Sequence, residues 1–155
     1  MEAIETLLVE VPVFHGLPPD DLALIAGCAK NVHFAQGAVL FREGDPADTF
    51  YFVRSGSVAL EMFVPARGSL LIETIDEGEV IGWSWLFAPY RWHFDARTLT
   101  PVRATGFDGA CLRGKCDADP TLGYALMSRF AHLLIERLQA TRFRLLDVYG
   151  DVGAA

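Results

Sequence analysis

The feature that most constrains the fold is a series of short apolar segments between residues 32 and 107, each closed by turn-forming residues. The segments at 50–53, 58–64 and 70–75 are continuous or alternating in hydrophobicity, a pattern typical of β-strands. Val39 to Phe41 and residues 94–107 continue the pattern, the latter around a turn at Thr100-Pro101. Because the intervening segments are too short for long helices, the sequence predicts an antiparallel jelly roll.

Helices are expected on both sides of these strands. The stretch PPDDLALIAGCAK predicts a short N-terminal helix that is capped by Asp20 and ends at Lys30. After Asp119-Pro120 a long helical segment runs to Tyr149 without an internal proline. The fold class is therefore mainly β with flanking helices. We expect one domain over 1–155, with a helical segment at about 1–31, a β-roll at about 32–110 and C-terminal helices at about 111–149.

The long C-terminal segment has two apolar faces. One face carries Tyr124, Met127, Ala131, Leu134, Leu138, Thr141, Leu145 and Val148. The other carries Leu126, Phe130, Leu133 and Phe143. One face is expected to lie on the β-roll and the other on a second copy, giving a parallel homodimer. The alternative is a monomer whose helix buries one broad face.

The composition limits the class of protein and the kinds of partner that this chain can have. The hydrophobic fraction of 52% and charged fraction of 21% exclude a disordered chain, and no apolar run is long enough to cross a membrane. The acidic start MEAIETLLVE is unlike a signal peptide, so a cytoplasmic protein is expected. A net charge of −7 argues against a nucleic-acid partner. Cys28, Cys111 and Cys116 are expected to be reduced, buried thiols rather than a redox pair between Cys111 and Cys116.

The order VPVFHGLPPDDLALIAGCAKNVHFAQGAVLFREGDPADTFYFVRSGSVAL resembles the cyclic nucleotide-binding domain of the bacterial catabolite activator and fumarate–nitrate regulator superfamily. The most specific part is GDPADTFYFVRSG, from Gly44 to Gly56. Phe41 departs from the pattern, since the family has a smaller β-branched residue there. The resemblance runs from about Phe14 to the end of the long helix. It implies a small jelly roll with a nucleotide held in a phosphate-binding cassette.

The resemblance implies that this cassette begins at Gly78-Glu79, with the Glu79 carboxylate accepting from a ribose 2′-hydroxyl. A short helix would then point backbone N–H groups at the cyclic phosphate. The candidate ligand-binding residues are Gly78, Glu79, Val80, Ile81, Gly82, Trp83, Ser84, Arg91 and Trp92. No metal site and no certain cofactor are expected, with cAMP or cGMP as the possible ligand.

The end of the cassette departs from the family. Trp92 occupies the position of an arginine that contacts the phosphate, and His93 and Phe94 stand where small residues belong. Arg91 is one residue too early, and a one-residue offset in a strand turns a side chain to the opposite face. Loss of a charged hydrogen bond to phosphate typically removes about 1.5–3 kcal/mol. A weak or altered ligand is therefore expected.

Three functions are compatible with these residues. The first is a sensor that binds a cyclic nucleotide or related phosphorylated ligand and signals through its C-terminal helix to a partner protein. The second is a non-binding dimerisation adaptor whose pocket is plugged by Trp83, Trp85 and Trp92. The third is a haem or redox sensor using His93 with Cys111 or Cys116. We favour the first because Gly78-Glu79 and Arg91 are present.

Two further classes are not expected. A metalloenzyme with a jelly-roll fold needs several histidines in a cluster, whereas residues 92–94 offer one imidazole. No nucleophile, phosphate-loop or paired-carboxylate motif is visible, so an enzyme is not expected. The family's transcription factors continue into a helix-turn-helix domain, which residues 150–155 do not supply. The expected output is another protein or the dimer itself.

Overall fold

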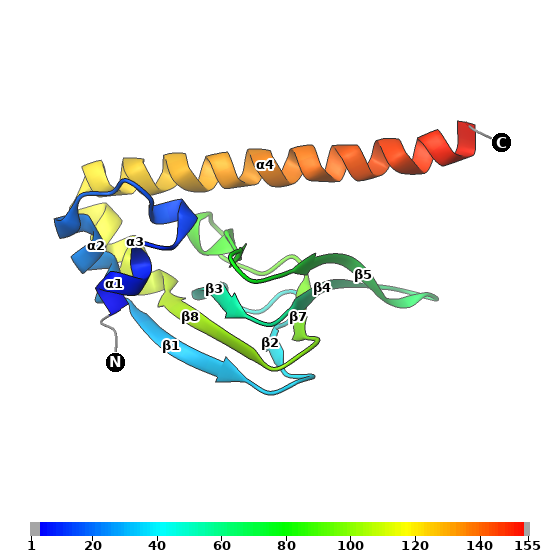
Figure 1. Ribbon diagram of the computed structural model, residues 1–155, viewed down its shortest axis with the longest axis horizontal. Coiled ribbons are helices and arrows are strands. Elements are labelled where there is room, and N and C mark those ends of the chain that lie inside the picture. The colour runs from blue at the N-terminus through cyan, green and yellow to red at the C-terminus, as the bar shows by residue number, and fades with distance from the viewer. Residues whose placement is uncertain (1–3, 154–155) are drawn as a thin grey trace.

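The computed structural model describes residues 4–153 and the side chains of residues 4–148. Within that range the strands form two antiparallel four-stranded sheets, with strand orders β1-β8-β3-β6 and β2-β7-β4-β5. Figure 1 shows short helices gathered at one end of the sheets, while the longest helix, α4, runs along one side of the molecule. The predicted jelly roll with flanking helices is confirmed.

The strands coincide with the predicted apolar segments except for β6, which lies in the predicted cassette and was not predicted as a strand. They are β1 (Ala29–Phe34), β2 (Val39–Phe41), β3 (Thr49–Ser55), β4 (Val58–Val64), β5 (Gly68–Ile75), β6 (Val80–Ile81), β7 (Asp95–Thr98) and β8 (Val102–Asp108). The predicted last strand is divided into β7 and β8, which lie in different sheets on either side of the Thr100-Pro101 turn. This turn is what carries the chain from one sheet to the other.

The N-terminal helices differ from the prediction. They are α1 (Ile4–Leu8), the 3-10 turn η1 (Pro12–Phe14) and α2 (Pro19–Ala26). Asp20 does not cap α2: Pro18 is at the N-cap and makes no side-chain hydrogen bond. The helix also ends before Lys30, because Lys30 pairs with Gly106 in the β1–β8 ladder. The predicted cap and end of this helix were therefore wrong.

Two apolar clusters make up the core of the described chain. The first joins the helices to the β1-β8-β3-β6 sheet, and in it Phe50 stacks on Phe107 and on Trp85, with ring centroids 4.5 and 4.7 Å apart. The second fills the space between the two sheets and contains Phe41, Ile81 and Trp92. The two clusters place the tryptophans of residues 83–92 in different surroundings.

The C-terminal part consists of α3 (Gly109–Ala118) and α4 (Pro120–Gly153). Leu126 and Phe130 are fully buried and Leu133 packs against the first cluster, as expected for the face that lies on the β-roll. Phe143, predicted on the same face, is 66% exposed because this part of α4 extends beyond the core. The other predicted face is mostly exposed, including Tyr124, Leu138, Leu145 and Val148.

Cys28 and Cys111 form a disulfide across 83 residues of sequence, so the expectation of reduced thiols was wrong for both. The β1–β8 ladder pairs Ala29 with Phe107, which brings the residue before β1 close to the start of α3. The two Cα atoms are 5.8 Å apart, within the range that a disulfide spans. Cys116 is free, and burial raises the pKa of its thiol.

Candidate ligand-binding site

The cassette, residues 78–92, begins at a turn that is locked to β3. Gly78 has a φ of +89°, a backbone conformation that favours glycine. Its N–H donates to the Val53 carbonyl at 2.8 Å, and the Val53 N–H donates to the Glu79 carbonyl at 2.9 Å. The following strand, β6, pairs Val80 with Phe52. The opening of the cassette is thus fixed as a strand of the β1-β8-β3-β6 sheet.

The Glu79 carboxylate closes this turn. Its Oε1 accepts from the Asp76 N–H at 3.1 Å, and the residue also borders a cavity described below. The carboxylate is therefore held in place by the backbone of the turn. A ribose hydroxyl would have to share the carboxylate with the Asp76 amide.

The predicted short helix is a single 3-10 turn, η2 (Ser84–Leu86), with Trp83 at its N-cap. Gly82 has a φ of +100°, and a Cβ atom at Gly82 would lie 2.4 Å from the Trp92 ring. The indole of Trp92 thus lies directly against the Gly82 backbone. Ser84 is buried. The space in front of Gly82, where the resemblance places a phosphate, contains the Trp92 ring.

Trp92 and Arg91 point to opposite sides of the chain. The Trp92 N–H donates to the Asp45 carbonyl at 3.0 Å and its own carbonyl accepts from the Gly44 N–H at 2.9 Å. Trp92 is buried between the sheets, stacked on Phe41. Arg91 is exposed, and its Nη1 donates to the Gly44 carbonyl at 3.1 Å. Arg91 therefore does not replace the missing arginine inside the β-roll.

The three tryptophans do not form one plug. Trp85 is fully buried in the helical cluster, stacked on Phe50 and edge-on to Phe130. Trp83 is half-buried, with the guanidinium of Arg137 lying 5.1 Å from its ring centroid. Of the three, Trp92 lies between the sheets. The prediction that all three tryptophans plug one pocket was therefore wrong. Among the three, Trp92 alone fills the space between the sheets.

Arg137 of α4 is the functional candidate that the sequence reasoning missed. Its Nη2 donates to the Val80 carbonyl, and its guanidinium covers Trp83. Its Nη1 is buried without a hydrogen-bond partner among the described residues. Burial lowers the pKa of Arg137, against the opposing effect of Glu73 and Glu79. A signal was present, since residue 137 follows Leu126, Phe130 and Leu133 at the helical spacing of the buried face.

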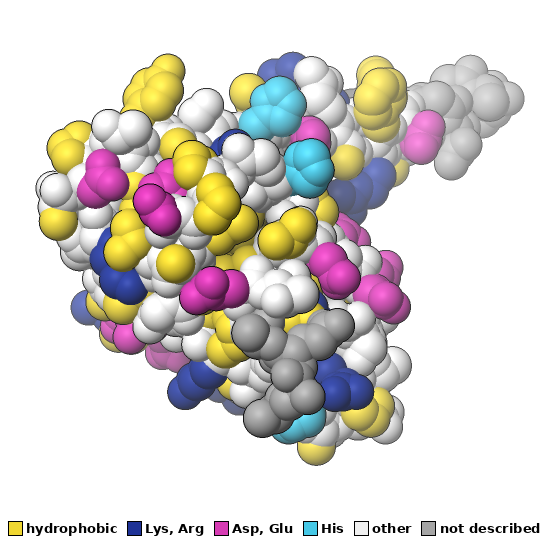
Figure 2. All heavy atoms as spheres, turned by 60° about the vertical axis from the view of Figure 1, so that its left-hand side comes forward, with side chains coloured by type: hydrophobic (Ala, Val, Ile, Leu, Met, Phe, Trp, Pro, Cys, Tyr) yellow, Lys and Arg dark blue, Asp and Glu magenta, His cyan; other side chains and the backbone are white. Residues whose placement is uncertain are grey.

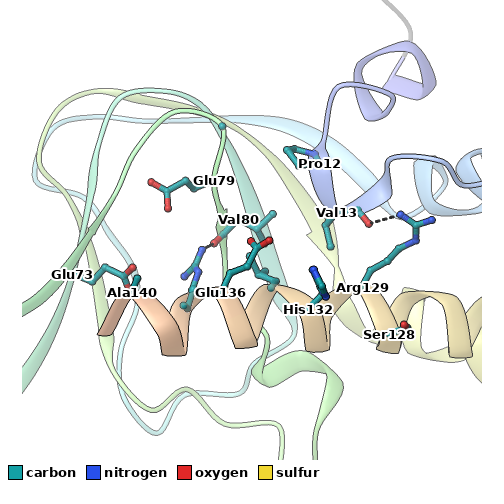
Figure 3. A pocket seen from close by; sticks show the side chains of 13 residues that line it. Pro12, Val13, Glu73, Glu79, Val80, Ser128, Arg129, His132, Glu136 and Ala140 are labelled. Atoms are coloured by element: carbon teal, nitrogen blue, oxygen red, sulfur yellow. Dashed lines mark hydrogen bonds between the residues drawn. The ribbon is translucent and has the colours of Figure 1, made fainter. Parts of the chain in front are cut away.

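A cavity of about 650 Å³ lies between the start of the cassette and α4. Figure 3 shows α4, with Arg129, His132 and Glu136, on one side of the cavity, and Glu79 and Val80 on the other. The cavity lining brings together Gly78, Glu79 and Val80 with Arg137. The other predicted site residues, Ile81, Gly82, Trp83, Ser84, Arg91 and Trp92, are not part of the lining.

The described residues do not support the haem or redox sensor that the sequence left open. Within residues 4–153 no group of three or more histidine, cysteine, aspartate or glutamate side chains is placed to hold a metal ion. His93 is exposed, and Cys111 is bonded to Cys28. Cys111 is therefore not a free thiolate.

None of the helices in the described part of the chain is long and apolar enough to cross a membrane.

A jelly roll with a Gly-Glu turn leading into a short helical turn, closed by a long C-terminal helix, defines a class of regulatory ligand-binding domains. The family model for the cyclic nucleotide-binding domain matches residues 31–119, more than half of the chain. The chain belongs to the cyclic nucleotide-binding domain family.

The chain is similar to a curated regulator and to a solved cyclic nucleotide-binding protein. It is 27% identical over 150 residues to a CRP-like cAMP-activated global transcriptional regulator of Mycobacterium tuberculosis, covering 96% of this chain and 65% of the regulator. The chain thus spans slightly less than two thirds of that relative. A solved structure of a candidate cyclic nucleotide-binding protein from Geobacter metallireducens is 30% identical, with a TM-score of 0.78 over 89% of this chain and 99% of the other.

A second solved structure shows the same fold at lower identity. This cyclic nucleotide-binding domain, from Methylobacillus flagellatus, has a TM-score of 0.80 and is 18% identical, covering 94% of this chain and 86% of the other. At that identity the similarity concerns the fold. The structural relatives thus agree with the family assignment that residues 31–119 establish.

Proposed function

We propose that this chain is a regulatory module that binds a cyclic nucleotide or a related phosphorylated ligand and signals through α4. The observation that carries the proposal is the buried guanidinium of Arg137, which has an unpartnered Nη1 and lines the cavity beside Glu79. A buried donor without a partner costs about 1–3 kcal/mol, and more when the group is charged. An anionic ligand would remove that cost by a charge-assisted hydrogen bond.

The cavity suits such a ligand in size, and its lining sets cationic side chains beside Glu73, Glu79 and Glu136. Its volume of about 650 Å³ falls within the roughly 300–1,000 Å³ typical of small-molecule sites. Arg129, His132 and Arg137 line it from α4, and no ion pair joins Arg137 to Glu73 or Glu79 among the described residues. Arg137 is thus available to take over the role that the family gives to the arginine at the position of Trp92.

Signalling would depend on the contacts that Arg137 makes with the cassette. Its guanidinium ties α4 to the Val80 carbonyl and to the Trp83 ring. A phosphate that bonds the same guanidinium would weaken these contacts. Because a ligand shifts an equilibrium only through contacts that differ between two states, this exchange of partners would couple binding to the position of α4.

We propose a second copy of the chain as the partner of α4, with another cytoplasmic protein receiving the signal. The exposed apolar residues of α4 include Ile135, Leu138, Phe143, Leu145, Leu146 and Val148. On the face shown in Figure 2, Lys and Arg side chains are scattered rather than gathered in one patch. Apolar contact between helices therefore suits this surface better than binding to a polyanion.

One observation favours a second candidate function, a dimerisation adaptor without a ligand. The Trp92 ring fills the space against Gly82, so a phosphate seated there would have to displace it. The adaptor requires that nothing bind in the cavity beside Arg137. The two functions thus differ in whether that cavity takes an anion.

A thermal-shift and calorimetric screen separates them. The probes are cAMP, cGMP, cyclic dinucleotides and the non-cyclic control AMP, up to millimolar concentration. A ligand at 100 times its Kd adds about 2.7 kcal/mol to the free energy of unfolding, which is readily detected. The sensor predicts a shift with at least one cyclic compound. No shift with any of them contradicts the sensor and supports the adaptor.

A further inference from the structure

The disulfide between Cys28 and Cys111 lies at a corner where α2, β1 and α3 meet. Cys28 stands between α2 and β1, and Cys111 is in the first turn of α3. A cavity of about 390 Å³ borders this corner, and both cysteines are part of its lining. Among the described residues, it shares no part of its lining with the cavity at Arg137. The corner is therefore a second concave site, separate from the candidate nucleotide site.

The two cysteines differ in how far they are buried. Cys28 is 7% exposed and belongs to the first apolar cluster, whereas Cys111 is half-buried and packs against the edge of that cluster. The lining also includes Lys30, Asp48 and Asp108, which are all exposed, so the cavity opens to solvent. The side chain of Cys111 is thus the more accessible of the two to a small molecule in the cavity.

Contacts other than the disulfide hold the same corner together. The Asp108 N–H donates to the Cys28 carbonyl at 2.8 Å, and the Asp108 carboxylate accepts from the Cys111 N–H at 3.0 Å. Lys115 Nζ donates to the Leu24 carbonyl at 2.6 Å, which joins α3 to α2. The S–S bond can therefore open while its surroundings stay in place, as a reversible modification requires.

We propose that the Cys28–Cys111 bond is a site of thiol–disulfide exchange with a low-molecular-weight thiol such as glutathione. A thiolate in the cavity attacks the Cys111 Sγ, a new S–S bond forms to that sulfur, and the Cys28–Cys111 bond breaks. The bonding electrons leave with the Cys28 Sγ, which takes up a proton from water. A second thiolate then displaces the Cys111 thiolate, so that two small thiols are oxidised to one disulfide while the two protein sulfurs are reduced.

Cys116, the third cysteine, is not expected to take part. It lies five residues after Cys111 on α3, which turns it to another side of the helix, and it is not among the described residues that line the cavity. Burial raises the pKa of its thiol, which lowers the fraction present as reactive thiolate. Unlike the sensor built on His93 and a free thiolate, the exchange uses the bonded pair of cysteines and needs no metal.

Exchange of the folded protein with millimolar reduced glutathione tests the site. Early time points are quenched with excess alkylating agent and mapped by peptide mass spectrometry. Glutathione is expected on Cys111 about tenfold more often than on Cys28, because exchange depends on access to the sulfur. Protein unfolded in urea is the control and should carry glutathione at similar levels on both. Labelling without preference for Cys111 in the folded protein, or a bond that does not open until the protein unfolds, would overturn the proposal.

A variant that narrows the cavity tests the route of entry. Lys30→Trp places a bulky side chain at the cavity, and His33→Trp, at an exposed position of the same strand outside the lining, is the matched control. Glutathione should open the disulfide about tenfold more slowly in Lys30→Trp and at the wild-type rate in His33→Trp. Equal rates in all three proteins would contradict entry through the cavity. If Lys30→Trp does not fold, the position of the label in the wild type decides. Because no nucleotide is used, failure of the ligand screen and failure of this exchange are separate outcomes.

Discussion

The indole of Trp92 lies flat on the ring of Phe41, with centroids 3.7 Å apart and planes 9° from parallel. Both residues depart from the family pattern, Phe41 in β2 and Trp92 at the end of the cassette. The two side chains that depart from the pattern are thus in contact. Both rings lie in the cluster between the sheets, where smaller side chains at both positions would leave space unfilled. A change at one position is therefore expected to be tolerated better when the other changes too.

Removing either ring should destabilise the β-roll. Trp92→Ala and Phe41→Ala are each expected to lower the free energy of unfolding by about 3–5 kcal/mol, because each leaves a cavity between the sheets. The double variant should lose less than the sum by about 0.5–1.5 kcal/mol, the coupling of a stacked pair. Urea denaturation measures all three. Phe63→Ala, at an exposed aromatic, is the control and should change stability little. Strict additivity would show that the stack contributes nothing of its own.

The Cys28–Cys111 disulfide should stabilise the fold. Cys111→Ser is expected to lower the free energy of unfolding by about 2–5 kcal/mol, because the bond closes a long loop in the unfolded chain. Cys116→Ser is the matched control, since Cys116 is not part of the bond. Alkylation of the unfolded, unreduced protein should modify Cys116 alone, as read by mass spectrometry. Modification of all three cysteines without a reductant would contradict the bond.

The exposed face of α4 should carry the homodimer. Leu138→Asp and Leu145→Asp place charge on two half-exposed apolar positions of that face and are expected to yield monomers, because burying an unpaired carboxylate at an interface is costly. Gln139→Asp introduces the same charge beside them and should leave the dimer intact. Light scattering coupled to size exclusion measures the mass. A wild-type mass of 17.1 kDa would contradict dimerisation at the outset.

Much of the fold could be predicted because its signals are local. Alternating hydrophobicity located the strands, and the absence of proline after residue 120 located α4. The same local rule correctly anticipated that Arg91 and Trp92 face opposite sides, since side chains alternate along an extended chain. The Asp20 cap failed because Pro18 and Pro19 set the start of α2, with no help from a side-chain acceptor.

The features that the sequence did not reveal depend on contacts between distant residues. The disulfide follows from the β1–β8 register, which single-sequence patterns do not fix. Arg137 was missed because a charged residue on a long helix is usually solvated, and its burial depends on how closely α4 approaches β6. The cavity likewise arises from that approach rather than from any motif.

The most direct test of the central claim is isothermal titration of the cyclic nucleotide that gives the largest thermal shift, into wild type, Arg137→Met and Arg142→Met. Arg142 is an exposed arginine of the same helix and serves as the control. Loss of a charged hydrogen bond to the ligand predicts that Arg137→Met weakens binding by about one to two decades, while Arg142→Met binds like wild type. Equal affinity in Arg137→Met and wild type, or no binding by the wild type, would contradict a ligand site built on Arg137.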